Sequence, residues 1–180
     1  MPPSQSHRQG VSMLNDTQLR DEVRRCGGPY PAEKVSAEFI RSLSVQCMWR
    51  MTYDGICFMF PDYFREAPLS VIRDITKRMI QMACYSSDAQ LSHETKQWMI
   101  TGLNSPENIR TYCQRNGFEE LEQFNDCIVV TSRGDVVSTS IYFRTIAIPR
   151  KFIGTEKKDE MIAEAYSRIV SGIDYFMEEA

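Results

Sequence analysis

The sequence predicts an α+β fold in which several helices pack on a small antiparallel sheet. Apolar residues recur at three- and four-residue spacing in several segments, as on one face of a helix, and β-branched and aromatic residues cluster in others. The 180 residues, 42% of them hydrophobic, suffice for the core of one domain. We therefore expect a loose N-terminal arm over residues 1–30 and a single α+β domain over residues 31–180, without internal repeats.

The first two predicted helices cover residues 16–25 and 32–45. The first ends at a run of strong helix breakers, Gly27, Gly28 and Pro29. The second is predicted from a single apolar stripe, formed by Val35, Phe39, Ile40 and Leu43.

Strands are predicted at about residues 47–60, 126–132 and 136–148. The first region is rich in aromatic side chains, and Asp54-Gly55 divides it into two short strands of a hairpin. Pro149 ends the last strand, because proline cannot continue the hydrogen-bonded ladder. The tripeptide 133–135 (Arg-Gly-Asp) matches a sequence that integrins read, but we interpret it as turn chemistry.

Four further helices are predicted over residues 68–84, 92–101, 105–116 and 156–178, the last a long C-terminal helix. In the helix over 68–84, Pro68 suits the first turn, and the apolar stripe is formed by Ile72, Ile75, Met79 and Met82. Its opposite face carries three cations that could bind an anion: Arg73, Lys77 and Arg78. Asp74 stands four residues before Arg78, so we expect these two side chains to pair.

Cysteine and histidine usage excludes several kinds of metal and redox site. The six cysteines stand at least ten residues apart, so no CxxC pair exists, and we expect reduced thiols buried as small hydrophobes. Only His7 and His93 are present. The segment 93–97 (HETKQ) has glutamine where a metal-binding HExxH helix needs its second histidine, so we interpret it as a first helical turn. We therefore predict no metal, no cofactor and no catalytic set.

Charge and hydropathy limit the partners. The 21 basic and 24 acidic residues give a net charge of -3, which argues against a globally basic surface that coats nucleic acid. No apolar run approaches the roughly 20 residues that cross a bilayer. The first ten residues are polar, so we expect no secretory signal there. A soluble cytoplasmic protein without a membrane partner is expected.

Two groups of side chains are candidate sites. Basic and aromatic residues near the end of the last predicted strand could bind an anionic ligand or a partner: Arg144, Arg150, Lys151 and Tyr142. The same residues also suit a strand whose arginine stems cover a core. Cys84 and His93 would form a thiol–imidazole pair only if the fold brings them together.

One segment resembles a known family. Residues 60–72 (FPDYFREAPLSVI) resemble the strand-to-helix transition of SprT-like zinc metallopeptidases, including archaeal ones, and residues 98–115 are similar to their linking helices. The resemblance covers about residues 45–180 and implies a peptidase-like fold. In that family a helix after a strand carries the zinc-binding histidines and the catalytic glutamate. The helices expected there, over 68–84 and 156–178, contain no histidine, so neither metal ligands nor catalytic residues carry over.

The preferred functional hypothesis is a non-catalytic, peptidase-like protein that acts by binding a macromolecular partner, most simply another protein, in a regulatory or assembly role. One alternative is a small nucleic-acid-binding module that uses Arg144, Arg150 and Lys151. The other alternative is an unrecognised hydrolase built around a cysteine or carboxylates.

Overall fold

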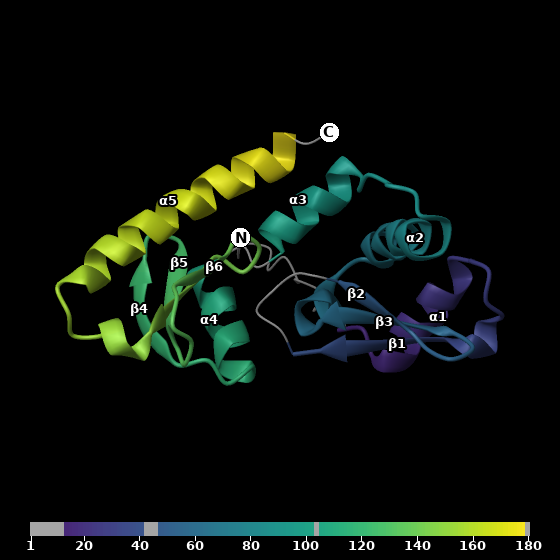
Figure 1. Ribbon diagram of the computed structural model, residues 1–180, viewed down its shortest axis with the longest axis horizontal. Coiled ribbons are helices and arrows are strands. Elements are labelled where there is room, and N and C mark those ends of the chain that lie inside the picture. Colours follow the sequence, from purple (N-terminus) through teal and green to yellow (C-terminus); the bar gives the residue numbers. More distant parts are fainter. Residues whose placement is uncertain (1–12, 42–46, 103–104, 179–180) are drawn as a thin grey trace, which may run out of the picture.

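The computed structural model describes residues 13–41, 47–102 and 105–178, and it confirms the α+β class (Figure 1). The described helices are α1 (Asp16–Arg25), α2 (Leu69–Tyr85), α3 (His93–Thr101), α4 (Pro106–Arg115) and the long α5 (Lys157–Glu178). Three described strands form a first sheet: β1 (Val35–Ile40), β2 (Met48–Met51) and β3 (Ile56–Pro61). Four form a second: β4 (Glu120–Phe124), β5 (Cys127–Ser132), β6 (Ser138–Ser140) and β7 (Thr145–Pro149).

Both sheets are mixed, where the sequence predicted one antiparallel sheet. In the first, of order β1-β3-β2, β3 is parallel to β1 and antiparallel to β2. In the second, of order β4-β5-β7-β6, β7 is parallel to β5 and antiparallel to β6. In each sheet one inner strand, β3 or β7, ends in a proline, and a short 3₁₀ turn then leads towards α2 or α5. The chain thus repeats one arrangement in two halves, the described residues from 13 to 85 with the first sheet and those from 93 to 178 with the second, although the sequence shows no repeat.

Residues 35–40 form strand β1, so the predicted helix over 32–45 is wrong for its described part; residues 42–45 lie outside the described residues. The reason is visible in the burial of side chains along the strand. Val35 and Ala37 are buried while Ser36 and Glu38 are exposed, which is the two-residue alternation of a sheet. Parallel pairing with β3 selects this pattern over the helical stripe.

The predicted strand over 136–148 is divided into β6 and β7 by a turn at residues 141–144. Arg144 closes this turn with a positive φ of 45°, which ends the extended conformation. Strand β4 was not predicted. The two strands expected at 47–60 are confirmed as β2 and β3, paired in antiparallel register.

The remaining predicted helices are confirmed to within two residues, and α1, α3 and α4 each begin at a side-chain cap. The Asn15 side chain accepts the Gln18 N–H at 2.8 Å to begin α1. Ser92 and Ser105 cap α3 and α4 in the same way. Helix α1 lies within the expected arm over 1–30, and its Leu19 and Val23 side chains are fully buried in the core.

One apolar cluster connects the two halves and is centred on aromatic rings. Tyr63, which follows β3, makes edge contacts with Tyr112 of α4 and Phe143 of the second half. Its hydroxyl donates to the main-chain carbonyl oxygen of Met99 at 3.0 Å. A second cluster lies between α5 and the second sheet. The two halves are thus packed together through shared side chains.

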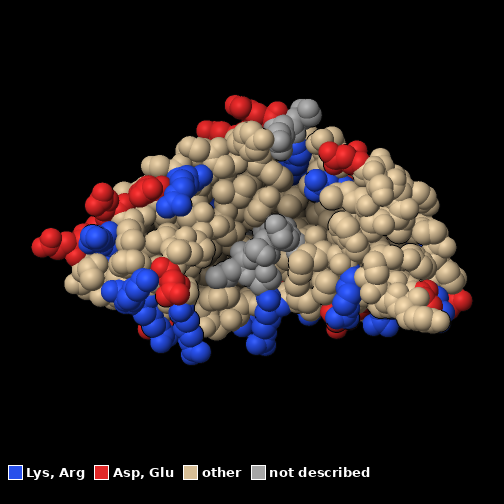
Figure 2. Space-filling model, viewed as in Figure 1, with Lys and Arg blue, Asp and Glu red and all other residues tan. Residues whose placement is uncertain are grey.

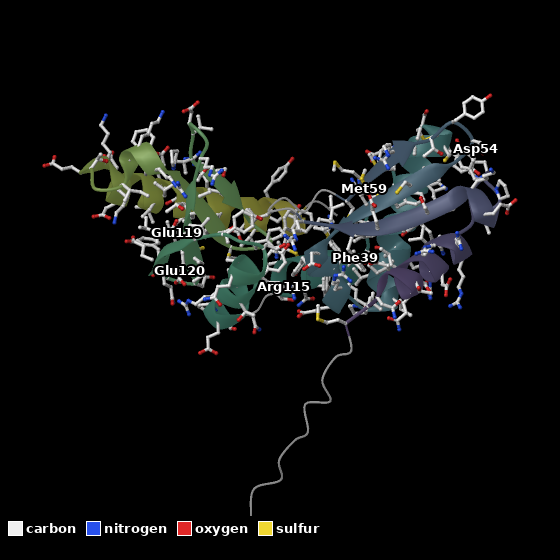
Figure 3. The ribbon with its side chains drawn as sticks, turned by 90° about the horizontal axis from the view of Figure 1, so that it is seen from below. Phe39, Asp54, Met59, Arg115, Glu119 and Glu120 are labelled. Carbon is white, nitrogen blue, oxygen red and sulfur yellow. The ribbon has the colours of Figure 1, made fainter. Side chains whose placement is uncertain are left out.

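A carboxylate also joins the two halves. Asp62, beside Tyr63, pairs with Arg65 and with Arg115, whose Nη2 lies 2.7 Å from Oδ2. Figure 3 shows Arg115 beside Phe39 at this junction, while Asp54 lies at the far end of the first sheet. Within the described ranges, no helix is long and apolar enough to cross a membrane.

Candidate functional site

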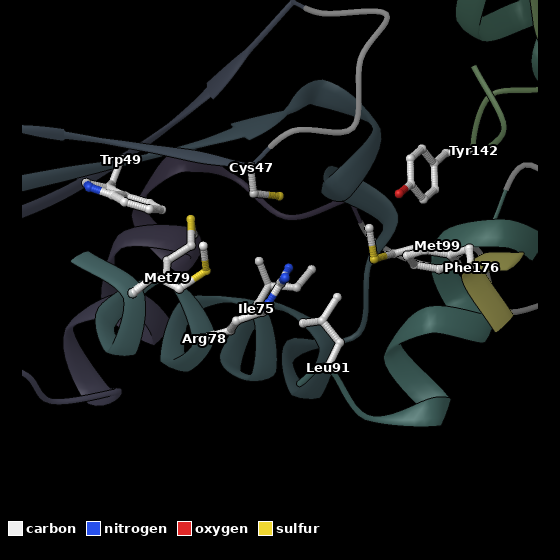
Figure 4. A pocket seen from close by; sticks show the side chains of 10 residues that line it. Cys47, Trp49, Ile75, Arg78, Met79, Leu91, Met99, Tyr142 and Phe176 are labelled. Carbon is white, nitrogen blue, oxygen red and sulfur yellow. The ribbon is translucent and has the colours of Figure 1, made fainter. Parts of the chain in front are cut away.

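A groove of about 260 Å³ lies between the two halves of the molecule (Figure 4). Helix α2 and strand β2 form one side, with Cys47 at the start of the strand. The other side is formed by α3, the turn before β7 and the end of α5, which contribute Met99, Tyr142 and Phe176. In Figure 2 the surface is hollowed between the two halves, where α2, α3 and β2 approach one another in Figure 1. The groove therefore exists only because the halves pack together.

Helix α2 presents one face to the groove. Its lining side chains follow the three- and four-residue spacing of one helical face: Ile75, Arg78, Met79 and Met82. Val71 and Ile72, one turn earlier, are buried in the core and fix the helix in place. The sequence predicted the apolar members of this face but placed Arg78 on the opposite, polar face of the helix. The structure shows that Arg78 borders the groove together with Ile75, Met79 and Met82.

Strand β2 is an edge strand. Its only partner in the described sheet is β3, so its other side carries unpaired backbone groups. Trp49 lies opposite Phe58 of β3, which is buried, so Trp49 points toward α2 and lines the groove. Met48 and Met51 are 42% and 49% exposed. An open strand edge therefore lies beside an apolar hollow.

Among the described residues that line the groove, Arg78 is the one with a charged side chain. Its Nε donates to the carbonyl oxygen of Ala89 at 2.8 Å. The predicted pairing with Asp74 is absent among the described residues, because Asp74 accepts the backbone N–H of Ser92 at 2.9 Å instead. Nor does any other carboxylate of the described chain pair with Arg78. The groove therefore carries a positive charge that the described chain does not neutralise.

The titratable side chains near Arg78 stay neutral. Burial raises the pKa of the Cys47 thiol well above its usual range, although the nearby Arg78 opposes this shift. Burial also raises the pKa of the Tyr142 hydroxyl. A reactive cysteine needs a lowered pKa so that it is a thiolate at neutral pH, whereas Cys47 stays a protonated, unreactive thiol. At neutral pH the Cys47 thiol and the Tyr142 hydroxyl therefore both keep their protons.

The predicted basic patch is spread over three places. Tyr142 lies in the groove, with its ring 5.3 Å from that of Phe176. Arg144 precedes β7 and pairs with Asp126 at 3.1 Å, while its buried Nε has no hydrogen-bond partner. Arg150 and Lys151 follow the other end of β7 and face acids of their own, Glu119 at 3.6 Å and Asp135 at 3.7 Å. An extended strand of this length spans about 17 Å, so these residues do not converge.

Cys84 and His93 lie on different helices. Cys84 is half-buried near the end of α2, and His93 is the exposed first residue of α3. No interaction between them is found in the described part of the chain. Residues 13–41, 47–102 and 105–178 also contain no group of three histidine, cysteine or acidic side chains that could hold a metal ion.

Sequence reasoning missed Trp49, Met99 and Phe176 as lining residues. They come from β2, α3 and α5, and each also belongs to an apolar pattern that a core explains. These residues would have been recognised only if β2 had been predicted as an edge strand. That position follows from the parallel pairing of β1 with β3, which the sequence did not predict.

Comparisons with protein-family models, with curated proteins and with solved structures gave no match. The function is therefore inferred from the side chains of the groove and from the open edge beside it.

Proposed function

We propose that this chain is a non-catalytic, peptidase-like protein that binds an extended segment of a partner protein in the groove between its halves. The observation that supports this proposal most strongly is the position of β2. It is an edge strand, and its Trp49 lines the apolar groove.

An extended segment can pair with such an edge through its main chain. Each backbone N–H and C=O on the open side of β2 offers a hydrogen bond to an added strand. Four residues of strand span roughly 13 Å, and alternate side chains of an added segment point to the same face of the sheet. Those on the α2 side enter the groove. Main-chain hydrogen bonds contribute affinity, and contacts of side chains with the groove determine which sequences bind.

The walls of the groove suit bulky apolar side chains. Thioether groups from Met79, Met82 and Met99 are polarisable and adapt to different shapes. Trp49 and Phe176 provide flat aromatic surfaces at separate places along the groove. Complete burial of one leucine-sized side chain contributes about 2 kcal/mol. Two such side chains therefore account for a useful part of a micromolar affinity.

The chemistry of the groove favours binding over turnover. Nucleophilic catalysis requires a nucleophile beside a base. The raised pKa of Cys47 keeps its thiol protonated, and His93 stands at the exposed start of α3 and does not line the groove. The resemblance to SprT-like peptidases, whose metal ligands have no counterpart in this sequence, agrees with a binding role.

The test selects peptides on the purified protein from a displayed library of random twelve-residue sequences. The dissociation constant of each selected peptide is then measured by fluorescence anisotropy. Trp49→Ala should weaken binding at least tenfold, because truncating an aromatic hot-spot residue of an interface costs about 2 kcal/mol or more. The matched control is Tyr53→Ala, at a fully exposed aromatic residue outside the groove, which should leave the affinity unchanged.

Main-chain pairing is tested with the same peptides. N-methylation of alternate amides should abolish binding in one of the two alternating sets and spare the other, because only one set faces β2. The proposal is overturned if no peptide is selected, or if Trp49→Ala, shown to be folded by its urea midpoint, binds as tightly as the native protein.

A further inference from the structure

We infer that the segment bound in the groove carries an acidic side chain, aspartate or glutamate, which pairs with Arg78 and is flanked by apolar side chains two residues away on each side. This inference rests on the proposed function, because it assigns a sequence to the same binding site. The observation behind it is the unneutralised guanidinium of Arg78 in an otherwise apolar groove.

The hydrogen bond of Arg78 leaves most of its donors available. Nε is held by the carbonyl oxygen of Ala89 at 2.8 Å, which fixes the plane of the guanidinium. The two Nη groups carry four more N–H donors, and among the described residues none of them has a hydrogen-bond partner. A planar guanidinium with free Nη groups matches the two oxygens of a carboxylate.

The charged residues around Arg78 do not neutralise it, which favours a ligand with a carboxylate. The nearest acid on the same helix, Asp74, is occupied by the Ser92 N–H, and Arg73 is paired with Glu22 at 2.8 Å. Lys77 is exposed and has the same sign as Arg78. The wall residues that the structure describes add thioether and aromatic groups and no carboxylate. Attraction between opposite charges is larger beside such walls than in bulk water, so a carboxylate gains most at this position.

The place of Arg78 in the groove selects an internal side chain over a C-terminal carboxylate. Figure 4 shows Arg78 between Trp49 and Met79 on one side and Met99 and Phe176 on the other. A chain that ended at Arg78 would fill only one of these apolar sides. In an extended segment, residues two positions apart lie on one face about 6.6 Å from each other. A sequence apolar–x–acidic–x–apolar therefore fills both sides around the charge.

The experiment uses a synthetic peptide of this pattern, Ser-Leu-Thr-Glu-Thr-Leu-Ser, acetylated and amidated at its ends. A second peptide has glutamine in place of the glutamate. On the native protein the glutamate peptide should bind at least tenfold more tightly, and the ratio should fall as salt is raised. In Arg78→Met the ratio should fall to about one, and in Arg78→Lys it should be intermediate because lysine offers no planar fork. Lys77→Met, on the same helix, is the matched control and should keep the full ratio.

Each outcome separates this inference from the proposed function. If both peptides bind equally well and Trp49→Ala weakens both, the inference of an acidic side chain is refuted, while the groove still binds peptides. If neither peptide binds, and library selection also yields none, the proposed function fails. A third peptide, Ser-Leu-Thr-Leu with a free carboxyl end, distinguishes the source of the carboxylate. If it binds more tightly than the glutamate peptide, the inference is overturned in favour of a chain terminus. The comparison of glutamate with glutamine on native protein holds even if Arg78→Met does not fold.

Discussion

Substitution of Gly102 by alanine tests the packing that joins the two halves. Gly102 follows α3 with φ −61° and ψ −39°, an ordinary helical conformation. On the backbone alone, alanine should therefore stabilise the protein by about 0.4–1 kcal/mol. The added methyl group, however, would overlap the Tyr63 hydroxyl, lie 2.8 Å from Tyr63 Cζ and lie 3.0 Å from the Trp98 carbonyl oxygen. Tyr63 is 1% exposed, so its ring has no free space to move into.

Overpacking at a site of this kind costs about 1–3 kcal/mol, so the net effect of Gly102→Ala should be a loss of about 1–2 kcal/mol. Urea unfolding followed by circular dichroism should show a lower midpoint with an unchanged slope, about 0.5–1 M lower for a slope near 2 kcal/mol/M. Tyr63→Phe alone should cost about 1 kcal/mol through its lost hydrogen bond. The double variant should lose less stability than the sum of the two single losses, because the oxygen that overlaps the new methyl group is gone.

Gly134→Ala is the control for the Gly102 substitution. It lies in an exposed turn where only the Ser132 Oγ atom approaches the position of a new methyl group, at 3.2 Å. Its midpoint should change little. A rise in the midpoint for Gly102→Ala would contradict the packing of Tyr63 against α3, because only the backbone term would then act.

Three further predictions concern charged groups and thiols. Asp62→Asn, which weakens a partly buried carboxylate bridge between the halves, should lower the free energy of unfolding in urea by about 2 kcal/mol. Asp54→Asn, at an exposed pair, should leave the free energy of unfolding nearly unchanged, and equal effects of the two substitutions would argue against the bridge. Burial raises the pKa of Cys113 to about 11 and that of Cys127 to about 12. In the unfolded chain these thiols lose their protons near pH 8.5, before they do so in the folded protein. The urea midpoint should therefore decrease as the pH is raised from 8.5 to 11. An increase of the midpoint over this range would show that these thiols are not buried. Glu22→Gln replaces a carboxylate that is 2% exposed and paired with Arg73. It should lower the free energy of unfolding by about 2–3 kcal/mol, and with it the thermal midpoint. A variant as stable as the native protein would show that the buried charge does not contribute to stability.

Local chemistry made most of the helices predictable. Ser92, Ser105 and Pro68 stand where α3, α4 and α2 begin, and each acts within a few residues of the chain. The segment 35–40 was not predictable in this way. Val35 and Phe39 fit both a helical stripe and a strand face, and the choice between them is made by pairing with β3, some 20 residues away.

The candidate site was predictable only in part. Met79 and Met82 were placed on one face of α2 by their spacing, and Arg78 was recognised as a candidate for anion binding. The availability of Arg78 depends on Asp74, which pairs with a main-chain N–H beyond the end of the helix. Tyr142 and Phe176 reach the groove because the two halves pack against each other, and no local pattern in the sequence records that contact.

The most direct test of partner binding in the groove is nuclear magnetic resonance of the protein with ¹³C-labelled methionine methyl groups, titrated with the glutamate peptide. The account predicts that the signals of Met79, Met82 and Met99 shift on saturation, while those of Met13 and Met161, outside the groove, stay in place. Shifts confined to Met13 or Met161, or no shifts at saturating peptide, would contradict the groove as the binding site.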